Sequence, residues 1–311
     1  MDRVGRTGHG QLIGTPLTLS LLGSAGEGNL AVPIRKRFTL GTLRLELIPS
    51  GRGLGAAALH VDGAAMITGA AGRSARGGHT VLYAGAVRTT TGGAGDAAEV
   101  RSCDALVVGA PFGEPHHVFP PLTKVIDQAC SWARAQLAND KRPVLLVDTA
   151  LDGLEVALRL ADAGLPVAAA RPIREAAARA AGAVAFPPAR GGAARARGDV
   201  DASRRWIASP GKEPRAVVWL DSDHAGVLKA LSGKRFATAL ASGRALDSAT
   251  GYDTAFPWAH AADRKQLLAW IESANARDVF VTGTCADSIA HVLGARARVI
   301  GPPRQMALFA T

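Results

Sequence analysis

The sequence is poor in cysteine and aromatic residues and has no long apolar run, and these shortages exclude several classes of protein. Its 311 residues include three cysteines, Cys103, Cys130 and Cys285, which are far apart and form no C-x-x-C pair. Neither a disulfide framework nor a thiolate zinc site is therefore indicated. No stretch approaches the roughly 18 apolar residues of a membrane span, and the first residues, MDRVGRTGHGQ, lack the apolar core of a signal peptide. The sequence predicts a cytoplasmic protein without a membrane segment.

Acidic residues are also few relative to basic ones. Lys and Arg total 36 against 26 Asp and Glu, so the formal net charge is +10, and arginine supplies most of the positive charge. This surplus favours a polyanionic partner such as nucleic acid, although a basic protein without such a partner fits the charge equally well. Half of the surplus lies in residues 171–205, with eight basic and three acidic residues. That segment fits a phosphate-binding surface or a solvated linker.

The spacing of apolar residues predicts a β-rich first third followed by α/β structure. Residues 38–48 alternate as in a half-buried strand, with Leu43, Leu45 and Leu47 on one face. Residues 104–110 form a short apolar run, which is typical of a strand buried on both faces. After PFGEPHHVFPP, helical spacing alternates with short apolar runs, as in βαβ units of a parallel sheet covered by helices.

Four segments carry a resemblance to a known family. LIPSGRGLGAAAL is similar to a strand followed by a G-H-x-L-G-S-A turn, VLYAGAVR to Y-x-G-D-x-x-R, and LVVGAPFGEPHHVFPP to E-S-T-F-G-x-P followed by F-P-P. ASGRALDSATGYDTAFPWAHAADRKQLLAWIE resembles S-G-W-A-L and F-P-L-S-D-H-A-D followed by a helix. Together they resemble the β-CASP branch of the metallo-β-lactamase fold. The bacterial ligase-associated DNA damage response exonucleases, relatives of messenger-RNA 3′-end processing nucleases, look most similar.

The resemblance implies a fold, a domain plan and a chemistry. The expected fold is α/β, a metallo-β-lactamase αββα sandwich with an inserted Rossmann-like β-CASP domain. The metallo-β-lactamase-like domain would comprise residues 1–114 and 236–311, the latter with a C-terminal tail, and the insert would comprise 115–235. Members of the family hydrolyse phosphodiesters with two metal ions held by clustered His and Asp.

The residues that would bind these metals are replaced in this sequence. Positions that correspond to family ligands are occupied by Arg52, Ala86, Gly109, His260, Ala261 and Thr282. The main family cluster, H-x-H-x-D-H, would precede Gly10, where Asp2 is the one match and Arg3 takes a histidine place. Alanine and glycine cannot coordinate a metal, and an arginine adds a fixed positive charge. The sequence therefore predicts no metal, no cofactor and a protein that is not an enzyme.

Basic residues near this pocket are predicted to bind nucleic acid instead. Arg52, Arg88, Arg244 and His260 would hold backbone phosphates in the cleft between the domains without cutting them. The expected ligand is single-stranded nucleic acid, DNA in preference to RNA. In the alternative interpretation, the arginines fill vacated space and pair with local acids.

Two alternatives retain an active metal-dependent DNA or RNA exonuclease. In one, the ligands precede the first residue in a longer natural chain. In the other, Asp221, Asp223 and His224 form a new metal site, although an aspartate before a helix is more often an N-cap. The neighbouring His116 and His117 are expected to point in different directions and so not to share a metal.

The C-terminal sequence PPRQMALFAT points to a protein partner. Gln305, Met306, Leu308 and Phe309 lie in QMALF, which resembles the Q-L-x-L-F peptide that bacterial replication and repair proteins insert into the sliding clamp. Alternatively, the Leu-Phe pair docks on its own domain as a closing strand. The predicted function is thus a non-catalytic β-CASP protein that binds nucleic acid or scaffolds a DNA repair partner.

Overall fold

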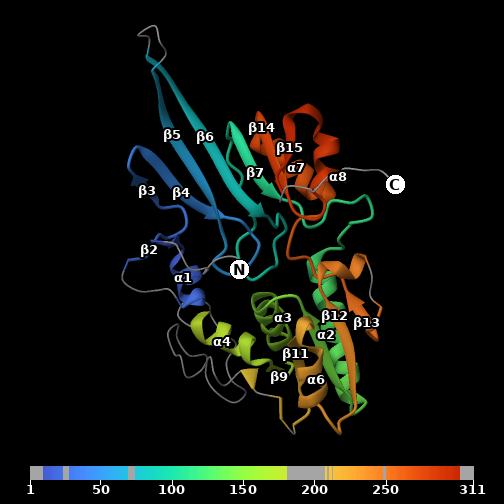
Figure 1. Ribbon diagram of the computed structural model, residues 1–311. Helices are drawn as coiled ribbons and strands as arrows, with labels where there is room; N and C mark the ends of the chain where they lie inside the picture. Colours follow the sequence, from blue (N-terminus) through green and yellow to red (C-terminus); the bar gives the residue numbers. More distant parts are fainter. Residues whose placement is uncertain are drawn as a thin grey trace, which may run out of the picture.

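The computed structural model describes residues 10–23, 28–68, 74–180, 207–208, 210–211, 213–247 and 250–301. The described chain is a mixed α/β protein built as two units, one above the other in Figure 1, each around its own sheet. Among these residues, none of the helices combines the length and apolarity needed to cross a membrane.

The first unit, called the mixed-sheet unit, contains seven strands in the order β15-β14-β7-β6-β5-β4-β3. The strands are β3 (Arg37–Leu40), β4 (Leu43–Pro49), β5 (Ala57–Thr68), β6 (Ser74–Ala86), β7 (Ala105–Gly109), β14 (Asp278–Thr282) and β15 (Ala297–Val299). Pairing is antiparallel from β3 to β6 and parallel from β6 to β15. Parallel pairing of β7 with β14 joins segments on either side of the second unit in sequence.

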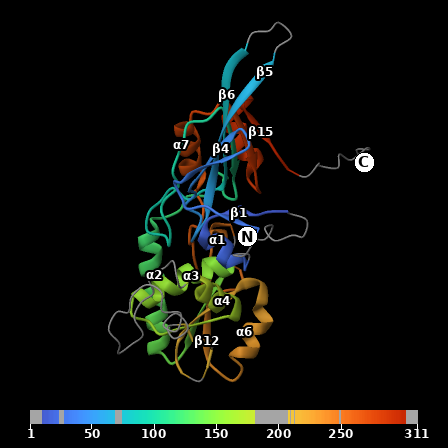
Figure 2. The ribbon, with the colours of Figure 1, turned by 90° about the vertical axis from the view of Figure 1, so that its left-hand side faces the viewer.

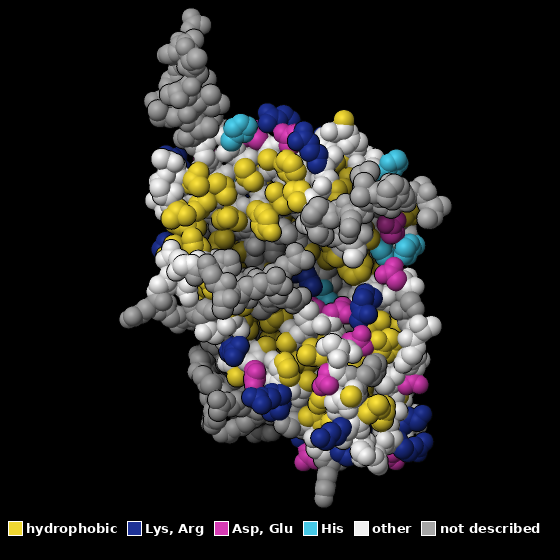
Figure 3. Space-filling view, in the orientation of Figure 1, with side chains coloured by type: hydrophobic (Ala, Val, Ile, Leu, Met, Phe, Trp, Pro, Cys, Tyr) yellow, Lys and Arg dark blue, Asp and Glu magenta, His cyan; other side chains and the backbone are white. Residues whose placement is uncertain are grey.

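One face of this sheet is covered by helices α7 (Arg264–Ala274) and α8 (Ala286–Leu293) (Figures 1 and 2). Alternate strand residues such as Leu82, Leu106 and Val281 point to that face and form a core with helix residues such as Ile271 and Ile289. Figure 3 shows the opposite face, where apolar side chains lie at the surface over β4, β5 and β6.

The second unit, called the parallel-sheet unit, contains six strands in the order β10-β9-β11-β8-β12-β13, and all its pairs are parallel. The strands are β8 (Arg142–Val147), β9 (Val167–Ala169), β10 (Ile207–Ala208), β11 (Ala216–Leu220), β12 (Phe236–Ala241) and β13 (Thr254–Phe256). Helices α2 (Leu122–Ala138), α3 (Ala150–Asp162) and α4 (Arg171–Ala180) share one core with the sheet, and α6 (His224–Ala230) packs on its other face. These parallel strands with helices between them confirm the expected βαβ organisation. Because the sheet is buried on both faces, its strands are near-continuous apolar runs.

Short elements complete the described structure. They are β1 (Ile13–Gly14), α1 (Pro16–Leu22), β2 (Leu30–Ala31) and the 3-10 turns Asp221–Asp223, Gly243–Leu246 and Gly294–Arg296. Helix α1 begins at Thr15, whose hydroxyl accepts a hydrogen bond from the Thr18 amide, and it contacts α4 across the two units.

Three expectations from the sequence need correction. Strand β12 pairs with β8 and β13 pairs with β12, so the insert runs past residue 235 to about Phe256. The strand expected over 38–48 is a hairpin, because Gly41 turns the chain at φ +59°. The strand expected to be buried on both faces, β7, leaves Val107 partly exposed. The expected mixed α/β fold is confirmed. The second sheet of an αββα sandwich is not among the described residues, whose other sheets are the β1–β2 pair and that of the parallel-sheet unit, so this finer architecture stays a prediction.

Candidate functional site

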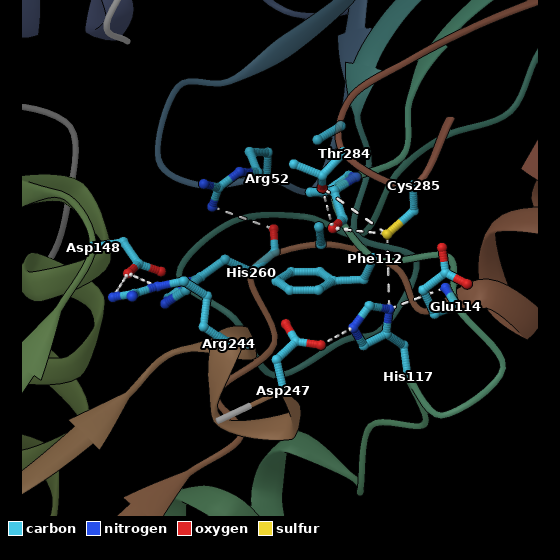
Figure 4. Close-up of a pocket in the computed structure, with 14 residues that line it drawn as sticks. Arg52, Phe112, Glu114, His117, Asp148, Arg244, Asp247, His260, Thr284 and Cys285 are labelled. Atoms are coloured by element: carbon cyan, nitrogen blue, oxygen red, sulfur yellow. Dashed lines mark hydrogen bonds and ion pairs between the residues drawn. The ribbon is translucent and has the colours of Figure 1, made fainter. Parts of the chain in front are cut away.

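A cleft of about 610 Å³ lies between the two units. Residues that follow β7, β14, β8 and β12 line it, so the carboxyl ends of parallel strands from both sheets face the same space (Figure 4). Pro111 and Phe112 come from β7, Thr284 and Cys285 from β14, and Arg244 from β12. This end of a parallel sheet is where α/β proteins usually bind ligands.

Four of the six degenerate positions line this cleft, and the other two, Gly109 and Thr282, lie beside Ala86 in the sheet. Thr282 is paired with Gly109, and Gly109 with Ala86, so these three lie side by side at the ends of β14, β7 and β6. Ala86 and Ala261 line the cleft, together with Arg52 and His260, which are joined by a 3.4 Å hydrogen bond from Arg52 Nη1 to the His260 carbonyl. A Cβ atom on Gly109 would lie 2.9 Å from the Ala86 amide nitrogen, so this position has no room for a side chain.

Arg52 is paired with a carboxylate at the start of α3. Its Nη1 donates to Asp152 Oδ1 at 3.1 Å, and His260 Nδ1 lies 3.4 Å from the same oxygen. Thr149 caps α3 and holds the other oxygen, because its hydroxyl donates to Asp152 Oδ2 at 2.8 Å. Burial alone would raise the pKa of Asp152, but His260 and Arg52 lower it below its ordinary value. The charge of Arg52 is therefore already compensated.

The position of Arg88 differs from the prediction. It was predicted to bind phosphate, yet it is fully buried, and its Nη1 donates to both oxygens of Glu155 at 2.8 and 3.1 Å. Glu155 also accepts from the Ala94 amide at 2.8 Å and from Trp258 Nε1 at 3.2 Å. Burial opposes ionisation of Glu155, but His260 and Arg88 outweigh it and lower its pKa. A guanidinium without solvent exposure cannot contact a nucleic acid, so Arg88 instead joins the two units.

Arg244, the third arginine, contacts two carboxylates from neighbouring strand ends. Its Nε donates to Asp148 Oδ1 and its Nη2 to Asp221 Oδ2, each at 2.8 Å. The hydrogen bond with Asp221 is the main cause that raises the pKa of Arg244 further. Tyr252 donates to Asp221 Oδ1 at 2.6 Å, and burial together with this bond raises the pKa of Tyr252 to about 12.

These pairs leave the cleft without a surplus of positive charge. Its lining contains Arg52 and Arg244 but also three carboxylates, Glu114, Asp148 and Asp247. Ten of the 36 basic and four of the 26 acidic residues lie outside the described residues, so +6 of the net +10 resides there. The geometry therefore favours the interpretation in which the arginines pair with local acids.

The neighbouring His116 and His117 do converge, contrary to expectation. Their Nε2 atoms lie 2.8 and 2.7 Å from the same oxygen, Asp247 Oδ1. The hydrogen bond from His116 is the largest cause that lowers the pKa of Asp247. Within the described part of the chain, this is the only group of three or more His, Cys, Asp or Glu side chains close enough to share a metal ion.

The chemistry of His117 does not suit a metal. The backbone amides of Gly113 and Glu114 both donate to its Nδ1 at 3.1 Å, so this nitrogen is unprotonated and the proton is on Nε2. A metal at Nε2 would then require an imidazolate. The same bonds occupy the lone pair that faces Cys285 Sγ at 3.9 Å, so His117 is not placed to act as a base toward the thiol. The cluster is best described as a set of structural hydrogen bonds that connects the turn at His116 and His117 to the segment after β12.

The alternative site near α6 is likewise occupied by structural bonds. Asp223 is the N-cap of α6 and accepts from the Gly226 amide at 3.1 Å and from Trp219 Nε1 at 3.0 Å. Asp221 is held by Arg244 and Tyr252, and the side chain of His224 lies outside the described residues. The N-cap interpretation of this aspartate is confirmed.

Sequence reasoning missed the acidic partners of the arginines. Asp152 and Glu155 are three residues apart on α3, both are buried, and both face the mixed-sheet unit. Two acids at this spacing in the otherwise apolar stretch DGLEVAL were the available signal. The proposed partner residues Gln305, Met306, Leu308 and Phe309 lie outside the described residues.

Comparisons with known proteins give one partial similarity. No protein-family model matches this chain. The chain is 28% identical over 239 residues to a protein from Opitutus terrae named a probable DNA ligase. The match covers 74% of this chain and 22% of that protein, so the chain spans about a fifth of the length of the curated relative it matches.

Proposed function

We propose that this chain is a non-catalytic protein of the β-CASP metallo-β-lactamase type that serves DNA processing by binding a DNA ligase, not by cleaving nucleic acid. The observation that carries the proposal is the cleft: four of the six positions expected to hold metal ligands line it, two lie beside it in the sheet, and only His260 has a good ligand side chain.

The architecture supports the fold assignment in this proposal. A parallel α/β unit is inserted between β7 and β14, two adjacent strands of a mixed sheet. The segments that resemble the family, at the ends of β4, β6 and β7 and before α7, all reach the cleft between the units. Motifs far apart in sequence but close in space are what a degenerate active site of this family would leave.

The chemistry supports the absence of catalysis. A two-metal phosphodiesterase needs several ligands placed around ions a few ångströms apart. Ala86, Gly109 and Ala261 have no ligand atom, and the nearby carboxylates of Asp148 and Asp152 are bound to Arg244 and Arg52. The residues present therefore do not fit a metal pair.

The ligase partner is inferred from the partial similarity. In the Opitutus terrae protein, a segment similar to this chain makes up 22% of a much longer polypeptide named a probable DNA ligase. A segment that shares a polypeptide with a ligase in one protein commonly serves a contact with that ligase. The similar segment in this chain would then contact a ligase as well.

Nucleic acid binding is a second candidate function, favoured by the net charge of +10. Because the cleft arginines are paired and most of the surplus lies outside the described residues, such binding would not depend on the cleft. Substituting Arg52 and Arg244 by alanine would then leave the affinity for single-stranded DNA and its salt dependence unchanged. A large loss in the double variant would restore the cleft as the nucleic acid site.

Metal content and cleavage test the non-catalytic assignment. We expect less than one zinc or manganese ion per chain by mass spectrometry of the metal, and no cleavage of end-labelled single-stranded DNA with manganese added. Asp247→Asn and Asp223→Ala serve as controls, since each removes one alternative ligand. Two bound ions per chain, or cleavage that either substitution abolishes, would contradict the proposal.

Binding to the ligase is a separate test. Isothermal titration of the purified chain with the DNA ligase of its source organism should show a saturable one-to-one complex. Serum albumin at the same concentration is the negative control. If no complex forms at micromolar concentrations while the chain is folded by circular dichroism, the ligase part of the proposal is wrong.

A further inference from the structure

The charges in the cleft between the two units do not balance. Two arginines line it, and five carboxylates either line it or bind these arginines. The five are Glu114, Asp148, Asp152, Asp221 and Asp247. Adjacent charges cancel in pairs, Arg88 with Glu155 and Arg264 with Asp263. With neutral histidines, the cleft therefore carries a formal charge of −3 in a chain whose total is +10.

Hydrogen-bond acceptors in the cleft are left without donors among the described residues. The partly buried carboxylate of Glu114 has no hydrogen bond or ion pair with them, and Asp247 binds both histidines through Oδ1 alone. His260 is 5% exposed and lines the cleft, and its buried Nε2 has no partner there. Because its Nδ1 faces the carboxylates of Asp152 and Glu155 at 3.4 and 3.9 Å, Nδ1 carries the proton and Nε2 presents a lone pair. Unpaired acceptors favour a ligand that brings N–H groups.

The ring of Phe112 divides the cleft into two sides. Figure 4 shows Arg244 and Asp148 on one side of the ring. Glu114 and His117 lie on the other side. An edge-to-face contact with His117, with ring centres 5.4 Å apart, helps to fix the ring. Cations bind favourably beside aromatic rings, so the Glu114 side combines two features that attract a positive group.

We propose that the cleft binds an organic cation, whose ammonium or guanidinium head lies between Glu114 and the ring of Phe112. Its carbon chain would lie along the apolar part of the lining, which includes Pro111, Ala86 and Ala261. A cleft of about 610 Å³ has the size of a small-molecule site and is far larger than a single metal ion. A phosphate group would meet more carboxylates than arginines and would be repelled.

Titration calorimetry with agmatine, which carries a guanidinium and an ammonium group on one carbon chain, tests this site. At low ionic strength we expect saturable one-to-one binding, because the carboxylates are then weakly screened. Glu114→Gln keeps the shape of the side chain but removes its charge, and it should weaken binding about tenfold. Asp127→Asn is the matched control, since it removes the same charge from an exposed position on α2 and should leave the affinity unchanged.

Several outcomes would overturn the proposal. Agmatine may not fail to bind at concentrations up to about 10 mM, and inorganic phosphate must not bind more tightly than agmatine. Equal affinity in the wild type and Glu114→Gln, or equal weakening by Asp127→Asn, would also count against the site. Should Glu114→Gln fail to fold by circular dichroism, Phe112→Leu removes the ring but keeps an apolar side chain, and an unchanged affinity in that variant would reject the site.

Competition with the DNA ligase identifies the source of the cation, since this head group occurs on free amines and on Lys and Arg side chains. If bound agmatine prevents the complex with the ligase, the head group belongs to a side chain of the ligase. If the complex forms unchanged, the ligand is a free amine. Agmatine binding is measured without the ligase, so absence of a ligase complex would reject the proposed partner and leave the cation site standing.

Discussion

Removing Arg88 and removing Glu155 from their buried ion pair should lower the free energy of unfolding by different amounts. Arg88 cannot release its proton, and Glu155 is its only partner among the described residues, with Nε and Nη2 left without one. Glu155→Gln keeps the shape and the acceptor oxygen but leaves a buried, uncompensated cation. We expect this change to lower the free energy of unfolding by about 3–5 kcal/mol at any pH between 5 and 7.

Arg88→Met should cost less and should depend on pH. Glu155 retains the amide of Ala94, the indole of Trp258 and the nearby ring of His260, and it can also lose its charge by taking up a proton. Protonating a carboxyl of ordinary pKa 4.5 costs at most about 3.4 kcal/mol at pH 7 and about 0.7 kcal/mol at pH 5, at 1.36 kcal/mol per unit. The free energy of unfolding lost in Arg88→Met should therefore not exceed these values plus the contribution of the lost side-chain packing.

Urea denaturation followed by circular dichroism measures both effects. The two single variants and the wild type are compared at pH 7 and pH 5. The unfolding free energy is fitted with one common dependence on urea concentration, so that differences in the unfolding midpoint report differences in stability. Combining the two substitutions should recover most of the stability lost in Glu155→Gln, because neither charge of the pair remains. Equal costs for the two single variants, or a cost of Arg88→Met that does not fall at pH 5, would refute the reasoning.

Two further predictions concern acid stability and the tail. The pKa of Asp152 lies below its ordinary value of 3.8, so its pairing stabilises the fold above that pH and the contribution is lost as pH falls below it. Asp152→Asn should reduce stability at pH 7 and flatten the loss below about pH 4 in thermal unfolding, and a parallel, unflattened curve would contradict this. For the tail, titration calorimetry with the sliding clamp should show binding that is lost when Gln305 to Phe309 are deleted, and binding indifferent to the deletion would exclude the QMALF segment.

The sequence predicts most elements of this fold but not how they are assembled. The helices and strands follow from apolar periodicity, since burial on one or both faces leaves a local pattern. The apolar pattern of FATALA predicts a strand that would fit either sheet, so nothing local in the sequence indicated that β12 pairs with β8. The hairpin of β3 and β4 was missed although the sequence carries its signal, because Leu40 and Leu43 are three residues apart and the alternation therefore breaks at Gly41.

The position of the candidate site follows from the sequence motifs, whereas the hydrogen bonds of its arginines join residues that are distant in sequence. Arg52 meets Asp152 across 100 residues, and Arg88 meets Glu155 across 67. Whether an arginine faces solvent or a buried acid is decided by packing between the two units, which periodicity does not report. His116 and His117 were misjudged for another reason, since the rule that neighbours diverge holds for strands and these residues lie in a turn.

The tight contact at Gly109 has a consequence for the history of the protein. Under the proposed ancestry, an acidic residue once stood at this position, at the end of β7. Any side chain placed there now would meet the Ala86 backbone at 2.9 Å, so the strand ends have closed over the space a ligand needs. A single reverting mutation would damage the sheet before it restored a metal site. Under that ancestry, single substitutions would not readily reverse the loss of the nuclease.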